Sequence, residues 1–131
     1  MSTWHTEAED WALAAVTAAA SVPVVHLTAS LAPAPAGMTV FVGPAGMDTA
    51  VMRHSGAVTA DMTVDITVAA AGDRPADLRA MAQETDAIVD GLARAGARTI
   101  TTVPGTVNYQ QATNPVPART ITTTIAIEGA C

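Results

Sequence analysis

The sequence predicts an α+β fold, in which an antiparallel or mixed β-sheet carries two helices on one face. The chain has 131 residues, the length of one ordinary domain, so residues 1–131 are expected to form a single domain. Residues 62–68 alternate between apolar and polar side chains, as a half-buried strand does. Residues 78–92 repeat their apolar side chains at helical spacing instead. The order helix, strands, helix, two strands is typical of α+β domains.

The first element is predicted to be a helix that begins with a capping box at Thr6 and continues through the alanine-rich run 11–20. Pro23 ends this helix, because proline lacks the backbone N–H that a helix interior needs. Residues 22–28 are rich in β-branched side chains and predict a strand. The alanine- and proline-rich segment 32–37 predicts a stiff loop.

Three strands are predicted next. Residues 38–42 form a short apolar strand that ends at the turn Gly43-Pro44, and residues 48–53 form a second strand that turns at Ser55-Gly56 into the third. One face of the third strand carries Met62, Val64, Ile66 and Val68, and the other carries Thr63, Asp65 and Thr67. The sheet is therefore expected to be covered on one side and more polar on the other.

The second helix follows these strands. Asp73 is expected to cap it, Pro75 suits its first turn, and Gly91 or Gly96 is expected to end it near Arg94. The buried face is predicted to consist of Leu78, Met81, Ala82, Thr85, Ile88, Val89 and Leu92. The solvated face is predicted to consist of Asp77, Arg79, Gln83, Glu84, Asp86 and Asp90.

Two strands close the chain. The same six residues, Ala-Arg-Thr-Ile-Thr-Thr, open both at 97–102 and 118–123. Six residues are too few for a repeat architecture, so these segments are predicted to be two strands that pair with each other. The uncharged segment 109–118 predicts an unusually long hairpin loop, of the kind that is functional or mobile.

The composition excludes several classes of chemistry. All six basic residues are arginine, against twelve acidic residues, and the net charge is −6. Without lysine, the chain cannot form a lysine-containing phosphate loop or a Schiff base. The single cysteine, Cys131, excludes an intrachain disulfide and a multi-cysteine zinc site. Six scattered arginines in an acidic chain also make specific nucleic-acid binding improbable.

No membrane association is predicted for the uncharged segment 11–47. Alanine supplies most of its apolar character, and Ser21, Pro23 and His26 interrupt it. The residues before it are acidic, where a signal peptide would carry lysine or arginine. A buried helix followed by a buried strand is expected instead.

No catalytic residue, metal site or cofactor is predicted. His5 and Glu9 have the helical spacing of a metal-binding pair, but two ligands without a third indicate a solvated helix end. His26 lies in an apolar strand, which favours a hydrogen-bonded structural histidine. His54 and Asp48 lack an accompanying nucleophile motif. A small α+β enzyme or ligand-binding domain that uses His26 or His54 is the alternative from another functional class.

Three short motifs and the order of the elements resemble a known family. The motifs are Val40-Phe41-Val42-Gly43-Pro44, Thr63-Val64-Asp65-Ile66-Thr67-Val68 and Gly72-Asp73-Arg74. They are similar to the V-V-G-x-P strand end, the T-x-x-V-x-V strand and the x-D-R helix start of the tail terminator proteins of long, non-contractile-tailed phages. The lysine-free alphabet resembles that of phages with actinobacterial hosts. Loops 32–37 and 109–118 depart from the family pattern, so contacts made by loops are not carried over.

The resemblance implies a structural virion protein and no enzyme. It implies a homohexameric ring that caps the finished tail tube and joins it to the head–tail connector or stopper protein. Genome DNA would pass through the lumen without specific binding. The protein would assemble in the host cytoplasm and lie at the head–tail junction of the virion. Another head–tail joining or minor tail protein of similar fold is the alternative within this class.

In such a ring, uncovered strand edges such as residues 48–54 are expected to pair between subunits. Acidic side chains are expected to line the lumen, and the loop 109–118 is a candidate contact with the next ring of the tail. The arginines expected to pair with acids of neighbouring subunits are Arg53, Arg79, Arg94, Arg98 and Arg119. The candidate interface residues are Met47, Met52, Arg53, Arg98, Gln110, Gln111, Asn114 and Arg119.

Overall fold

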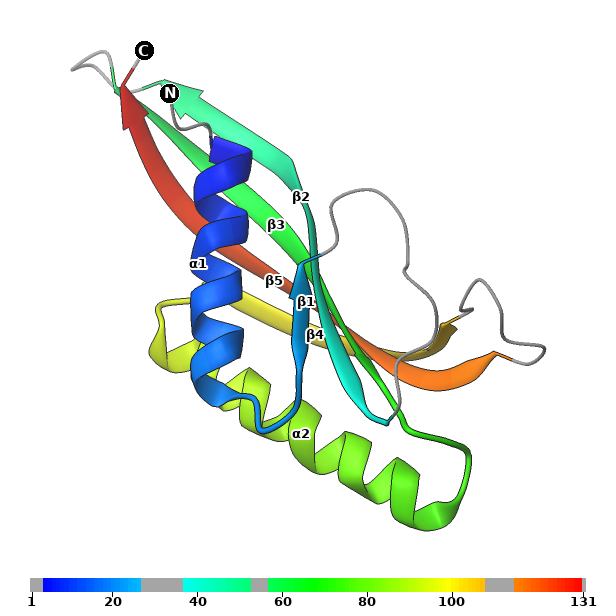
Figure 1. The fold of residues 1–131 in the computed structure, drawn as a ribbon. Helices are drawn as coiled ribbons and strands as arrows, with labels where there is room; N and C mark the ends of the chain where they lie inside the picture. The colour runs from blue at the N-terminus through cyan, green and yellow to red at the C-terminus, as the bar shows by residue number, and fades with distance from the viewer. Residues whose placement is uncertain (1–3, 27–36, 53–56, 108–114, 131) are drawn as a thin grey trace.

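The computed structural model describes residues 4–26, 37–52, 57–107 and 115–130. This part of the chain forms a five-stranded mixed sheet with two helices packed on one face (Figure 1), so the predicted fold class is confirmed. The elements are α1 (Trp4–Ala19), β1 (Val24–His26), β2 (Thr39–Met52), β3 (Ala57–Ala69), α2 (Pro75–Arg94), β4 (Thr99–Val107) and β5 (Val116–Ala130).

The strands lie in the order β1-β2-β3-β5-β4. Only β1 and β2 are parallel, and the other three neighbouring pairs are antiparallel. The two closing strands pair as predicted, with Thr99 opposite Thr124 and Val107 opposite Val116. The central position belongs to β3, which pairs along its whole length with β5.

The core lies between the sheet and the helices. Every second residue of β3 points into it, and the four apolar side chains expected to share one face are fully buried. Their helical partners are Ala8, Ala12 and Val16 of α1 and Met81, Ile88 and Leu92 of α2. Because burying one large aliphatic side chain stabilises a fold by about 1.5–3 kcal/mol, this layer holds both helices on the sheet.

Most of the opposite face of the sheet is polar, and no helix in the described ranges covers it. At one end of this face, Phe41, Ala69, Val107 and Ala118 form a small buried apolar cluster. Thr63 and Thr67 of β3 lie opposite Thr124 and Thr120 of β5. Between these pairs, the hydroxyl of Thr122 donates a hydrogen bond of 3.2 Å to Asp65. We refer to this surface as the open face, and its polarity agrees with the alternation in the sequence.

The prediction of two separate strands, 38–42 and 48–53, was wrong. β2 continues through Gly43-Pro44 to Met52, and its register with β3 shifts at two places along the way. Gly43 has a φ of 111°, a conformation that glycine adopts without a steric penalty. A bulge bends a strand without ending its pairing, which is why turn-forming residues did not stop β2.

The predicted starts of both helices also need correction. α1 already includes Trp4, so Thr6 lies inside the helix and does not cap it. The N-cap of α2 is Arg74 in place of Asp73, and no side chain caps it. The predicted end of α2 at Arg94 is confirmed: Gly91 lies within the helix, and Gly96, with a φ of 98°, follows its C-cap. Capping preferences are weak compared with tertiary packing, which selects the final boundaries.

Two strand boundaries differ as well. β1 starts at Val24, two residues later than the predicted strand 22–28, whose residues 27 and 28 lie outside the described residues. β5 starts at Val116, inside the predicted loop 109–118. Strand pairing with β4 orders the chain from Val116 onward. Residues 32–36 and 109–114 of the predicted loops lie outside the described residues.

Two positions of α2 lie on the wrong predicted face. Leu78 was expected to be buried but is 38% exposed, because it lies in the first turn of α2, before the residues that pack into the core. Glu84 was expected on the solvated face, but it is 5% exposed. Its carboxylate accepts hydrogen bonds from the backbone N–H of Ser21 at 3.0 Å and from the Ser21 hydroxyl at 3.0 and 3.1 Å. Ser21 lies in the connection between α1 and β1, which therefore covers this position of α2. Helical periodicity indicates which residues share a face, but it does not show that another segment lies over them.

The two helices approach closely at Gly91. A Cβ at this position would lie 2.6 Å from the Cβ of Ala19 in α1. Near the same end of α2, the indole N–H of Trp11 donates a hydrogen bond of 3.0 Å to the carbonyl of Ala95. The absence of a side chain at Gly91 therefore allows the observed helix packing.

We expect Gly91→Ala to lower the free energy of unfolding by up to about 2 kcal/mol. Overpacking costs about 1–3 kcal/mol, and the gain of about 1 kcal/mol in helix propensity offsets part of that cost. Chemical denaturation measures the change. The double variant Gly91→Ala/Ala19→Gly removes the clashing methyl group and should recover part of the loss. A Gly91→Ala protein more stable than the parent would contradict this packing.

We expect Glu84→Ala to lower the free energy of unfolding by about 1–3 kcal/mol, because it removes a charged acceptor from the hydrogen bonds with Ser21. Gln83→Ala is the matched control, since Gln83 is the exposed neighbour in the same helix and its change should stay within about 0.5 kcal/mol. Equal denaturation midpoints for the two variants would show that the Glu84 contact contributes nothing.

Candidate functional site

His26 is held in a contact that joins α1 to β1 and β2. Its Nε2 lies 2.6 Å from Oε1 of Glu9, and the other carboxylate oxygen of Glu9 accepts a hydrogen bond of 3.2 Å from the backbone N–H of Ala45. His26 is therefore hydrogen-bonded, as its position in the sequence suggested. Glu9 uses both oxygens to connect the helix to the edge of the sheet.

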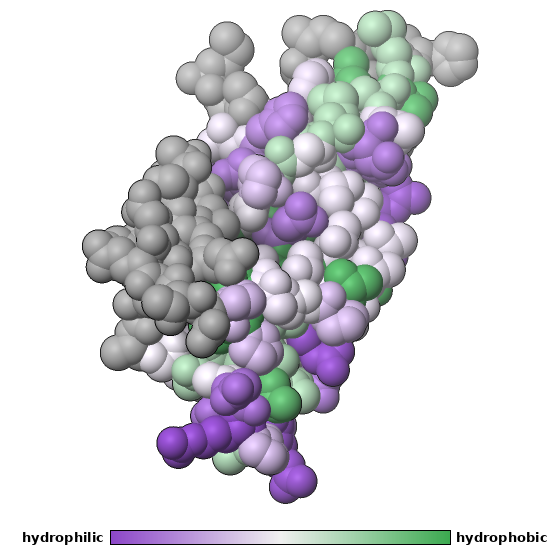
Figure 2. Space-filling model, turned by 90° about the vertical axis from the view of Figure 1, so that its right-hand side faces the viewer, coloured by the Kyte–Doolittle hydropathy of each residue, from purple (hydrophilic) through white to green (hydrophobic). Residues whose placement is uncertain are grey.

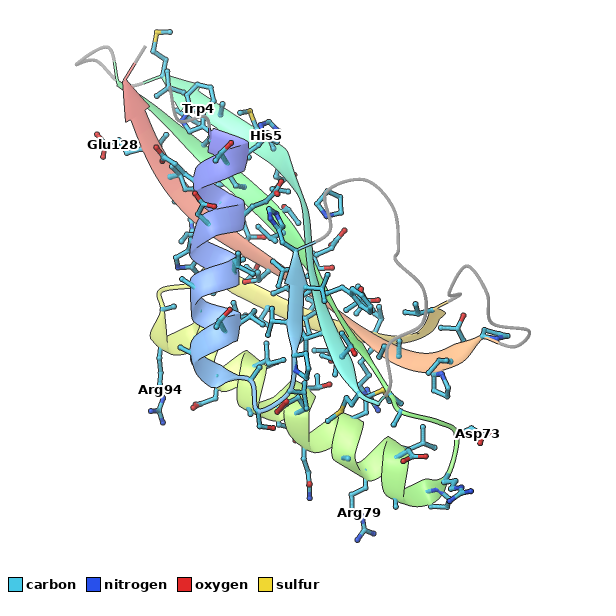
Figure 3. All side chains as sticks on the ribbon, viewed as in Figure 1. Trp4, His5, Asp73, Arg79, Arg94 and Glu128 are labelled. Atoms are coloured by element: carbon cyan, nitrogen blue, oxygen red, sulfur yellow. The ribbon has the colours of Figure 1, made fainter. Side chains whose placement is uncertain are left out.

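The other histidines add no site within the described residues. His5 is exposed at the start of α1 (Figure 3), and its possible metal partner Glu9 contacts His26 instead. Among the residues that the structure describes, no group of three or more His, Cys, Asp or Glu side chains could hold a metal ion. His54 lies outside the described residues.

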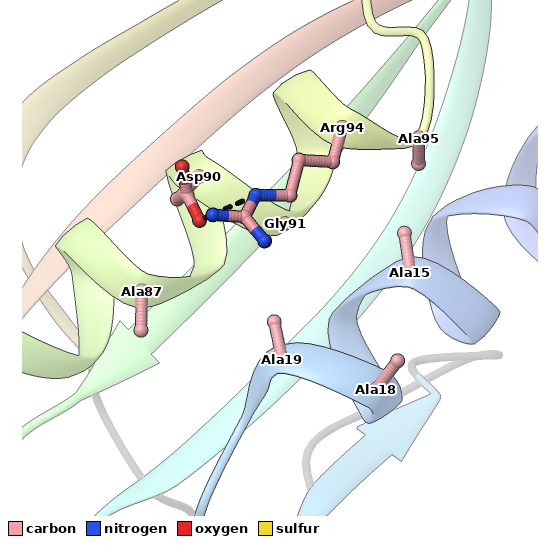
Figure 4. Close-up of a pocket in the computed structure, with 8 residues that line it drawn as sticks. All are labelled: Ala15, Ala18, Ala19, Ala87, Asp90, Gly91, Arg94 and Ala95. Carbon is pink, nitrogen blue, oxygen red and sulfur yellow. Dashed lines mark ion pairs between the residues drawn. The ribbon is translucent and has the colours of Figure 1, made fainter.

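An open groove of about 530 Å³ lies between α1 and α2 (Figure 4). Asp90 and Arg94 of α2 form an exposed ion pair of 3.0 Å beside it. The remaining lining is small and apolar: Ala15, Ala18, Ala19, Ala87, Gly91 and Ala95. These lining side chains include no nucleophile and no histidine, so the groove offers helix packing and no evident chemistry.

The outer half of β2, residues 46–52, is an uncovered sheet edge. β1 pairs with β2 only at Val40–Val42. Beyond Ala45, β3 is the one strand among the described residues that pairs with β2, and the other side of β2 has no neighbouring strand there. All seven residues are exposed, and Asp48 is the one charged residue among them. Soluble proteins usually protect such edges with charges, so this edge is suited to pairing.

Large apolar side chains are also exposed on this edge. Met47, Val51 and Met52 are 38%, 62% and 70% exposed. Figure 2 shows apolar surface gathered at the upper end of the molecule, where β2 ends and β3 begins, and hydrophilic surface at the lower end, where α2 begins. Exposed apolar side chains next to unpaired backbone groups favour contact with another protein surface.

β4 forms the opposite edge of the sheet. It pairs with β5 alone, carries no charged residue, and exposes 54% of Val103. Pro104 is its one edge-protecting residue, because proline offers no backbone N–H to a neighbouring strand. The described sheet therefore has two weakly protected edges, on opposite sides.

The predicted interface residues fall in different places. Met47 and Met52 lie together on the β2 edge. Arg98 precedes β4, and its Nη1 lies 2.7 Å from Oδ1 of Asp61 in the same chain. Arg119 lies on β5 opposite Val68, on the core side of the sheet, and its buried Nε has no hydrogen-bond partner among the described atoms. Arg53, Gln110, Gln111 and Asn114 lie outside the described residues.

Arg79 and Arg94, two further arginines expected to form ion pairs between subunits, extend from α2 away from the sheet (Figure 3). Pairing of any arginine with a neighbouring subunit stays a prediction. Val51 and Val103 were not among the predicted site residues. The sequence feature that could have indicated them is the near absence of charge in residues 46–52 and 99–107. This feature points to an interface only when the sheet order shows that both segments lie at edges of the sheet.

No helix in the described ranges is long and apolar enough to span a membrane. The chain matches no protein-family model and no curated protein sequence. The sequence motifs and the two sheet edges are therefore the features of this chain that bear on its function.

Proposed function

We propose that this chain is a structural virion protein, a tail terminator that forms a homohexameric ring on the end of a phage tail tube. The observation that carries the proposal is the outer half of β2, an exposed strand edge with apolar side chains and one charge. Such an edge favours assembly with another copy, as a ring subunit requires. The motif resemblance supplies the kind of ring.

The partners follow from this role. The ring binds the tail tube protein on one side and the head–tail connector or stopper protein on the other. It assembles in the host cytoplasm and stays at the head–tail junction of the virion. The protein acts by binding these two partners and by closing the end of the tail tube, and no catalytic step is part of this role.

The charge of the chain supports a ring through which DNA passes. Each subunit carries a net charge of −6, and the open face of the sheet presents Asp65 and Glu128 among threonines. Acidic side chains repel phosphates, so a lumen lined by this face lets the genome slide without being held.

Imaging of the protein in purified virions, together with its mass in solution, tests the function. A sixfold ring at the head–tail junction is the expected result. Density elsewhere in the virion would instead identify another head–tail joining or minor tail protein. A monomer in solution without density in any particle would contradict a virion role and would favour a ligand-binding domain.

Val51→Lys is expected to weaken self-association at least about tenfold, because a lysine on an edge strand opposes pairing with another strand. Val51 is 62% exposed, so the free energy of unfolding should change by no more than about 0.5 kcal/mol. Sedimentation velocity measures the assembly. Leu78→Lys is the control, since Leu78 is an exposed apolar residue on α2, away from both edges. Unchanged assembly of Val51→Lys would exclude this edge as the interface.

Self-association is also expected to strengthen as the salt concentration rises from about 0.05 M to about 0.5 M. Identical subunits of charge −6 repel one another, and salt screens that repulsion. Backbone pairing and apolar contact at the edge depend much less on salt. Sedimentation at several salt concentrations measures this dependence, and dissociation by salt would show that ion pairs between subunits dominate instead.

A further inference from the structure

We propose that copies of this chain join by antiparallel pairing of the outer half of β2 in one subunit with β4 of the next. The sheet then continues from subunit to subunit. This inference rests on the proposed ring, because it takes the partner to be a second copy joined head to tail. It goes further by naming the two strands that pair and their register.

The sheet order supports a head-to-tail contact. β2 and β4 lie toward opposite sides of the sheet, and β2 runs antiparallel to β4 because three antiparallel pairings connect them. A neighbour in nearly the same orientation therefore presents its β2 antiparallel to β4. This contact joins two different surfaces, the type of interface that a closed ring requires.

The charges disfavour the symmetric alternative. Pairing two copies of β2 would bring two Asp48 side chains into one short edge, and like charges on paired strands destabilise a sheet. It would also leave β4 uncovered. Pairing β2 with β4 places the single Asp48 against a strand without charged residues, so no like charge on the paired strand opposes it.

The two faces of the sheet restrict the register. On β2, Val51 lies on the open face, because its neighbour Ala50 is opposite the buried Ala60. On β4, Thr101 lies on the open face opposite Thr122. Side chains of paired strands keep to the same face only if Val51 lies opposite an odd-numbered residue of β4.

The lengths of the strands narrow the register further. Val51 of β2 pairs with Thr59 of β3. The β5 residues that pair with Thr99 and Thr101 also pair with Thr63 and Asp65 of β3, so these positions lie at the same height along the sheet. If Val51 of one subunit lies opposite Thr99 or Thr101 of the next, successive subunits are shifted by about 13–20 Å along the strand direction. Each subunit extends the sheet by about 19 Å across the strands.

This stagger corresponds to a strand tilt of about 35–45°, the range found in closed barrels. A larger offset, with Val51 opposite Val103, would require a steeper tilt. The geometry therefore places Val51 opposite Thr99 or Thr101 of the next subunit.

Cysteine cross-linking tests the pairing in a Cys131→Ser background, which removes the native thiol. Chains with Val51→Cys are mixed with chains carrying Thr99→Cys or Thr101→Cys and then oxidised. Opposite side chains on paired strands lie close enough for a disulfide. Thr102→Cys is the matched control, because Thr102 is exposed like Thr101 but points to the other face. The thermal midpoints of the reduced variants establish that each one folds.

The expected result is a mixed disulfide dimer with Thr99→Cys or Thr101→Cys, formed several-fold more than with Thr102→Cys. Equal cross-linking of Thr102→Cys would overturn the face assignment. Efficient cross-linking of Val51→Cys with itself would show symmetric pairing of β2. An assembled protein without any cross-link, or a chain that stays monomeric, would overturn the inference.

Cross-linking together with the imaging of virions separates this inference from the proposed function. A cross-link in solution together with a protein absent from the head–tail junction retains the strand pairing and rejects the terminator role. A sixfold ring at the junction without the cross-link retains the role and rejects the pairing.

Discussion

The buried row of apolar side chains on β3 is the constraint on which the rest of this structure depends. Met62, Val64, Ile66 and Val68 point to one face, and their complete burial requires that both helices lie on that face. Shifting the register of β3 by one residue would turn its threonines and Asp65 into the core. The pairing of β3 with β2 and β5 keeps this row on the core side of the sheet.

The same arrangement leaves the open face and two strand edges without cover in the described structure. The helices are both needed for the core, and β1 is long enough to pair with only three residues of β2. Along the rest of β2, the backbone groups on this side have no partner strand among the described residues. An edge with so little charge is suited to pairing with another chain, and the proposed assembly rests on it.

Several features were predictable because they depend on local periodicity. The alternation over 62–68 and the helical spacing over 78–92 identified the central strand and the second helix. The repeated Ala-Arg-Thr-Ile-Thr-Thr segments identified two strands that pair. Met47 and Met52 are exposed, and their role as interface residues stays a prediction. The errors concern Glu84, Asp73 and the turn at Gly43-Pro44, where segments distant in the sequence or a bulge decided the outcome.

The sequence alone determined most of the side chains that face the core, since alternation and helical spacing are properties of neighbouring residues. It also determined the chemistry that is missing, because folding cannot supply a lysine or a second cysteine. The tertiary structure decided that β2 and β4 lie toward opposite sides of one sheet and that a covering segment buries Glu84. These facts depend on contacts between residues far apart in the chain, and no local pattern encodes the order in which strands assemble.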